Sequence, residues 1–143
     1  MKTKPLTSDG GQTFALIFET GDEVVAGLTD FAVRHELRAA HFTAIGAFRE
    51  AVLAYFDWEK KDYVKIPVQE QVEVLVLTGD IALKDGQPVV HAHVVVGRRD
   101  GTTRGGHLIS AHVRPTLEVI LATGGALQKR HDAESGLALI AAD

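Results

Sequence analysis

EVLVLTGDIALKDGQPVVHAHVVV, residues 73–96, carries the clearest indication of the fold. Two apolar runs flank the segment Lys84-Asp85-Gly86-Gln87, and an Asp-Gly pair between such runs is typical of a tight β-hairpin. A second Asp-Gly turn follows in Arg98-Arg99-Asp100-Gly101-Thr102. Two such turns in succession favour an antiparallel core over a doubly wound parallel sheet.

A single helix is expected ahead of this β-rich region. Apolar side chains recur at spacings of three and four from Val24 onward, which predicts a helix running to about Ala40. The segment Thr20-Gly21-Asp22-Glu23 fits a capping box at its start. The fold class expected is α+β, with an antiparallel or mixed sheet packed against one principal helix. Strands are predicted at residues 12–19, 41–47, 51–58, 62–66, 73–77, 81–83, 89–96 and 116–122.

Length and composition predict one domain. The chain has 143 residues, of which 45% are hydrophobic, and no repeat or low-complexity linker divides it. We expect a flexible N-terminal segment over residues 1–11 and a single domain over residues 12–143. No apolar run is long enough for a signal peptide or a membrane span, so the sequence predicts a cytoplasmic protein with no membrane partner.

Charge and cysteine content exclude several classes of function. The net charge of −4 disfavours a protein that binds nucleic acid over its whole surface. Cysteine is absent and histidine occurs seven times, which excludes disulfide scaffolds, thiol catalysis and cysteine-based metal clusters. No nucleophile elbow, phosphate-binding loop or dinucleotide fingerprint is present, so no substrate is indicated.

The histidines of residues 89–96 are the strongest candidate site. In a strand, His91 and His93 point to the same face, about 7 Å apart along the chain. If the next segment returns as a hairpin, His107 after Gly105-Gly106 reaches the same end of the sheet. Three imidazoles with an open fourth position form a known zinc arrangement, and imidazole also suits copper, nickel or iron. A surface or interface histidine pair is the alternative interpretation.

The remaining polar candidates have structural explanations. His35 is expected to pack on the helix, His131 to lie in a solvated loop, and neither His41 nor His112 has a ligand pattern. Two glutamates, Glu73 and Glu118, lie inside apolar strands. Each is expected to face solvent, an arginine, a subunit interface or a metal, because an unpaired buried carboxylate is costly.

The order of motifs resembles the PPC domain, the plants-and-prokaryotes-conserved domain, over about residues 12–141. The resemblance rests on motifs in the order TGDEV (20–24), AIGA (44–47), EVLVLTGDIA (73–82), DGQP (85–88), HAH (91–93), DG (100–101), GGHL (105–108), PTLEV (115–119) and SGLAL (135–139). It implies an α+β fold assembled as a homotrimer. The stand-alone prokaryotic members of the family resemble metal-binding proteins. The resemblance therefore also implies a metal site in this chain, at His91, His93 and His107. Cupins share the His-x-His strand, but the glutamate that follows it in cupins is missing here.

Three functions follow as hypotheses. The first is a metal-binding homotrimer with a regulatory or ligand-sensing role, holding Zn²⁺ or another divalent transition metal and having no assigned enzyme activity. The second is DNA binding or transcription-associated assembly, as in the plant AT-hook relatives. This chain lacks the Arg-Gly-Arg-Pro hook and offers only Arg98, Arg99, Arg104 and Arg114. The third is a zinc-dependent hydrolase or lyase, with Glu73 or Glu118 as acid–base partner.

Overall fold

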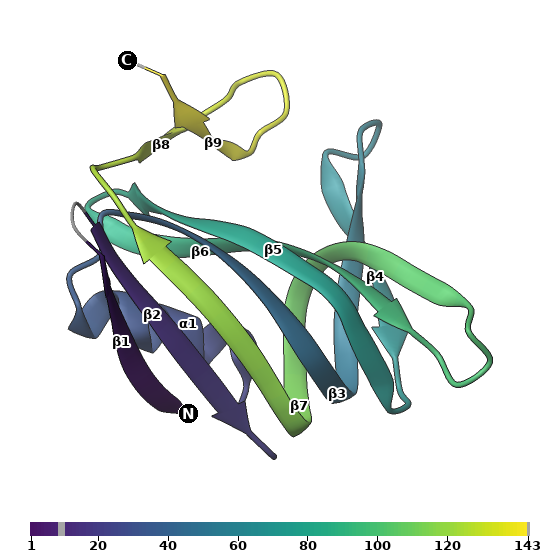
Figure 1. Ribbon diagram of the computed structural model, residues 1–143. Helices are drawn as coiled ribbons and strands as arrows, with labels where there is room; N and C mark the ends of the chain where they lie inside the picture. Colours follow the sequence, from purple (N-terminus) through teal and green to yellow (C-terminus); the bar gives the residue numbers. More distant parts are fainter. Residues whose placement is uncertain (9–10, 143) are drawn as a thin grey trace.

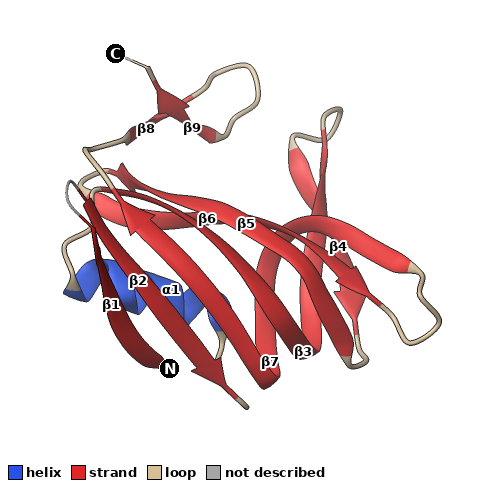
Figure 2. Cartoon of the chain, viewed as in Figure 1, coloured by secondary structure: helices blue, strands red, loops and turns tan. Residues whose placement is uncertain are grey.

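A long twisted sheet with one helix on its inner face makes up most of the molecule (Figures 1 and 2). The computed structural model describes residues 1–8 and 11–142. Nine strands and one helix lie in these residues, and the expected α+β class is confirmed as a strongly β-rich version with a single helix. The elements are β1 (Lys2–Ser8), β2 (Gly11–Glu19), α1 (Val24–Arg34), β3 (Ala39–Asp57), β4 (Asp62–Val68), β5 (Val72–Lys84), β6 (Gln87–Gly97), β7 (Thr103–Thr123), β8 (Gln128–His131) and β9 (Ala138–Ala141).

The strands pair in the order β1-β2-β7-β3-β5-β8-β9. In addition, β4 pairs with β3, and β6 pairs with both β5 and β7. All pairings are antiparallel except that of β5 with β8. The four strands β3, β5, β6 and β7 therefore form a closed ring of pairings, which leaves β6 without a free edge along residues 93–97.

Helix α1 begins at Val24, as predicted, but its N-cap residue and its C-terminal end differ from the prediction. Its N-cap is Glu23 rather than a residue of a capping box at Thr20: the Ala26 N–H donates to Glu23 Oε2 at 2.6 Å. The other carboxylate oxygen accepts from the Ala111 N–H on β7 at 3.0 Å, so one side chain both caps the helix and ties it to the sheet. The helix ends at Arg34, because Glu36 takes a positive φ of 51° and the chain turns into β3.

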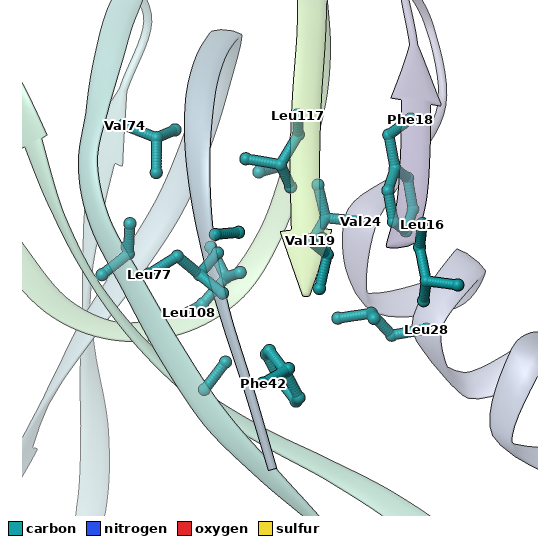
Figure 3. Close-up of a cluster of buried hydrophobic side chains, with 14 of the residues drawn as sticks. Leu16, Phe18, Val24, Leu28, Phe42, Val74, Leu77, Leu108, Leu117 and Val119 are labelled. Carbon is teal, nitrogen blue, oxygen red and sulfur yellow. The ribbon is translucent and has the colours of Figure 1, made fainter. Parts of the chain in front are cut away.

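The hydrophobic core lies between α1 and the inner face of the sheet (Figure 3). Alternate residues of each strand point inward, as Leu117, Val119 and Leu121 on β7 do, and all three are fully buried. Leu16 and Phe18 of the neighbouring strand β2 lie beside them on the same face of the sheet, and Val24 and Leu28 of α1 cover this face. This packing holds β6 and β7 firmly, and these two strands carry the histidines of interest.

Several predicted short strands are segments of longer ones. The strands expected at 41–47 and 51–58 are one strand, β3, whose pairing shifts at bulges near Gly46, Phe48 and Val52. Those bulges let a 19-residue strand bend without ending. Within the segment expected to be flexible, Lys2–Ser8 form β1 against β2, and residues 9 and 10 lie outside the described residues. In the part of the chain that the structure describes, no helix is long and apolar enough to cross a membrane.

Candidate metal centre

The three histidines singled out from the sequence meet on the outer face of the sheet. On β6, Ala92 and Val94 are buried while His93 is exposed, so the predicted alternation of faces is confirmed. His107 belongs to β7, and its Cα is paired directly with that of His93. The GGH segment is thus part of a strand, not of the loop before it.

The geometry of this His91–His93–His107 cluster suits one transition-metal ion. One possible ligand nitrogen from each residue lies within 4.8 Å of the other two. The Nε2 atoms of His91 and His93 are 3.3 Å apart. Two nitrogens bound tetrahedrally to zinc at about 2.0–2.1 Å would be roughly 3.3–3.4 Å apart. The pair on β6 already has this spacing, and His107 needs only a small movement to complete a three-nitrogen set.

His107 is held between two strands and an aromatic ring. Gly106 makes its placement possible, since a Cβ at that position would lie 2.6 Å from the Ala54 carbonyl oxygen on β3. The Tyr63 ring on β4 stacks on the imidazole, with ring centroids 4.7 Å apart. In the described part of the chain, His107 Nδ1 is buried and has no hydrogen-bond partner. A buried nitrogen left in this state fits a metal ligand, because the ion would supply the missing interaction.

The cluster favours neutral imidazoles, the form that binds metals. Burial, followed by the neighbouring His91 and His93, lowers the pKa of His107 to about 4. Burial also lowers the pKa of His91, assisted by the positive charge of Lys129, while Asp80 acts in the opposite direction. Both side chains therefore keep their nitrogen lone pairs at neutral pH.

Two charged residues that the sequence did not single out lie behind His91. Asp80 on β5 is the direct register partner of His91, and its Oδ2 is 3.4 Å from His91 Nδ1. Lys129 on β8 places its Nζ 3.4 Å from Asp80 Oδ1, and its side chain is only 6% exposed. The hairpin turn could have revealed Asp80, because pairing Lys84 with Gln87 fixes the register as far as the bulge at Val76, and the pair of Asp80 with His91 lies within this stretch. No comparable signal points to Lys129.

An open hollow of about 310 Å³ lies beside the cluster. His91 and His93 form one side of it, and Thr78, Gly79 and Asp80 of β5 form the other. Only glycine fits at position 79, since a Cβ there would clash with the His91 carbonyl oxygen and the Phe42 ring. A small ligand could thus reach a metal held by the histidines.

The other predicted candidates lie outside the cluster. His35 is exposed at the C-cap of α1 and stacks on Phe31, and His131 is exposed on β8, not in a loop. His112 Nδ1 lies 3.4 Å from Glu50 Oε1, and the exposed His41 is paired in register with Asp80. Glu73 and Glu118 are both exposed and belong to no ligand group in the described residues.

Among the arginines, Arg98 is already paired. Its Nε donates to Glu70 Oε1 at 2.6 Å, and this ion pair raises the Arg98 pKa. Arg104 donates to the Pro67 carbonyl at 3.4 Å. The charge of Arg98 is therefore partly neutralised, which leaves it less available for contacts with DNA phosphates.

The fold and the site together define a class: a β-rich α+β domain with one helix on its inner face and three histidines on its outer face. The profile of the Plants and Prokaryotes Conserved (PCC) domain, the PPC domain named above, matches residues 6–124. The chain belongs to this family.

Solved structures agree with this assignment. A metal-containing protein from Archaeoglobus fulgidus is 39% identical, with a TM-score of 0.86, over 93% of this chain and 95% of that one. A proposed DNA-binding protein from Ralstonia eutropha is 26% identical, with a TM-score of 0.87, over 98% and 96% of the two chains.

Among curated proteins, the bifunctional protein GlmU of a Synechococcus strain is 30% identical over 123 residues. These residues make up 85% of this chain, which spans only 18% of the length of that relative.

Proposed function

We propose that this protein is a cytoplasmic, homotrimeric metal-binding protein of the PPC family, in which His91, His93 and His107 hold one Zn²⁺ or similar divalent ion. The observation that carries the proposal is the 3.3 Å spacing of the His91 and His93 Nε2 atoms, with His107 beside them. The metal-containing relative from Archaeoglobus fulgidus, similar over nearly the whole chain, supports it.

The role proposed for the ion is to bind a ligand rather than to complete a closed structural site. Three protein nitrogens leave a fourth tetrahedral position open, and the 310 Å³ hollow gives access from solvent. A small molecule with an oxygen or nitrogen donor could occupy that position. This arrangement suits a regulatory or ligand-sensing protein, and the same ion would supply Lewis acidity to a bound carbonyl or water.

The homotrimer is supported by the outer face of the sheet. Ile45 on β3, Val95 on β6 and Ile120 on β7 are 61%, 37% and 45% exposed. The register places Ile120, Thr43, Thr78 and His93 in one row across four strands, so these apolar side chains share a face with the cluster. An exposed apolar face of this kind is typical of a contact between subunits.

Metal content of untagged protein, purified without chelator, tests the site. We expect close to one ion per chain in the wild type and loss of most of it in His91→Ala and His107→Ala. The matched control is His112→Ala, a partly exposed histidine on the same strand as His107. Equal metal content in all four proteins would overturn the proposal.

DNA binding is a second candidate, favoured by the likeness to the Ralstonia eutropha protein. Its test is affinity for duplex DNA across a salt series, since phosphate contacts make binding strongly salt-dependent. DNA binding predicts a steep loss of affinity with salt and a weaker slope in Arg99→Ala. Absence of binding at low salt rejects it.

A further inference from the structure

The contacts behind the cluster join it to the C-terminal hairpin formed by β8 and β9. This hairpin lies after residue 124, where the family profile ends. In Figure 1 it projects from the end of the sheet. It is joined to the rest of the molecule by the Lys61 side chain, which donates to the Glu134 carbonyl at 2.5 Å, and by the parallel pairing of Gln128 with Leu83. Lys129 follows directly, and its side chain is buried against Asp80.

We propose that Asp80 and Lys129 are positioning residues for the metal ligand His91, so that the C-terminal hairpin is a working part of the site. The proposal deepens the metal-binding function above and rests on it. Asp80 Oδ2 lies 3.4 Å from His91 Nδ1, where it would accept a hydrogen bond from the Nδ1–H. The lone pair of the neutral ring is then on Nε2, the atom that lies 3.3 Å from His93 Nε2. The other carboxylate oxygen, Oδ1, is buried without a hydrogen bond among the described residues. The Lys129 ammonium, 3.4 Å away, is the charge that would hold it in place.

The chemistry of this chain of contacts follows from the imidazole ring. A neutral histidine carries one proton, and a carboxylate at Nδ1 selects the tautomer that can bind a metal through Nε2. Metal binding at Nε2 makes the Nδ1 proton more acidic and so strengthens its contact with Asp80. An unpaired Asp80 would be drawn toward solvent or toward the ion itself, and the buried ammonium of Lys129 opposes both.

Lys129 would have two opposing effects on metal binding, and an experiment can distinguish one from the other. Its positive charge repels a cation directly, while its hold on Asp80 favours binding through His91. If the second effect operates, removing the charge weakens binding only when Asp80 is present. In a protein whose residue 80 is already neutral, removing it should leave binding unchanged or tighter.

The test is a double-mutant cycle on the full untagged chain, with Zn²⁺ affinity measured by competition with a chromophoric chelator. We expect Asp80→Asn to weaken binding about 10–100-fold. Lys129→Met should weaken it in the wild-type background but not in Asp80→Asn, and Lys129→Arg should restore most of the affinity. Lys65→Met, at an exposed position on β4, is the matched control and should bind as the wild type does.

A second readout does not depend on metal. Long-range ¹H–¹⁵N spectra of the metal-free protein report which nitrogen of His91 carries the proton. We expect Nδ1 in the wild type and a shift toward the Nε2 tautomer in Asp80→Asn. Thermal melts of the metal-free variants show whether any of them is unfolded, and the isosteric Asp80→Asn still decides the proposal if Lys129→Met unfolds.

Three results would overturn the proposal. If the Zn²⁺ affinity of Asp80→Asn lies within twofold of that of the wild type, Asp80 does not position His91. Equal weakening by Lys129→Met in both backgrounds would show that Lys129 does not act through Asp80. Absence of metal binding by the wild type would overturn the proposed function itself, and the inference with it.

Discussion

His107 is the histidine whose pKa the fold shifts most clearly. Its ring is stacked against Tyr63, its Nδ1 is buried, and its pKa is about 4 rather than the ordinary 6.5. The histidine is thus kept neutral by burial and by the histidines beside it. A residue held in this way is ready for a metal ion and resists protonation.

This shift predicts how acid affects the metal-free protein. The unfolded chain takes up the proton at about pH 6.5, whereas folded His107 takes it up only near pH 4, so folding loses stability as the pH falls through that window. His107→Phe keeps an aromatic ring against Tyr63 and removes the titration. We expect urea unfolding to show a shallower loss of stability from pH 6.5 to 4 in this variant than in the wild type.

The contrary outcome is the same pH slope in both proteins. That result would mean that His107 has an ordinary pKa, and that neither burial nor the cluster acts on it. His112→Phe, which changes a histidine outside the cluster, controls for the loss of an unrelated titrating group.

At this scale the sequence was informative where strand alternation applied. It predicted that His91 and His93 share a face and that His107 returns to them, because both statements follow from period-two geometry and a hairpin turn. Asp80 could have been found by extending the register of the Asp85-Gly86 turn. Lys129 could not, because a parallel pairing after a 21-residue strand leaves no local pattern.

The central element is β7, which pairs with β6 near its start and with both β2 and β3 near its end. Near its start it passes close to the backbone of β3, and Gly106 lies against that backbone. The Ala54 carbonyl would lie 2.6 Å from any added Cβ. The glycine therefore allows β7 to lie this close to β3 beside His107.

We predict that Gly106→Ala lowers the free energy of unfolding by about 1–3 kcal/mol, since the added methyl group forces backbone to move. Gly124→Ala is the matched control, because a Cβ there meets nothing within 4 Å and φ is not positive. Chemical denaturation of both variants measures the difference. Equal stability of the two would contradict the close approach described here.

The sequence predicted the types of the main helix and strands well, but their boundaries less well. The helix and the hairpin at Asp85-Gly86 were recognisable from periodicity and turn chemistry. The helix end was misplaced because apolar residues continue past Arg34 into β3, where they serve the same core in extended form. The unity of β3 was missed because bulges resemble turns in sequence.

At the scale of the whole molecule, the apolar outer face is the feature that the single chain leaves unexplained. It adjoins the cluster, and the proposed homotrimer would cover it. We predict that the wild type elutes with three times its 15.4 kDa mass by light scattering, and that Ile45→Lys reduces this mass. A buried lysine at a subunit contact would be costly unless paired.

Val33→Lys controls for the effect of adding a charge. Val33 is 51% exposed on α1, on the opposite side of the sheet from the cluster, so this variant should keep the wild-type mass. If the wild type remains monomeric at all concentrations, the proposed homotrimer is rejected. Composition could not have predicted this face, because a count of apolar residues does not say which of them, such as Ile45 and Ile120, are exposed.

The central claim is that three histidines on one sheet face hold a metal ion. Anomalous diffraction at a metal absorption edge, from crystals of untagged protein purified without chelator, tests it most directly. We expect one peak per chain at about 2.0–2.1 Å from a ring nitrogen of each of His91, His93 and His107. Well-ordered histidines with no peak between them, in protein supplied with zinc, would contradict it.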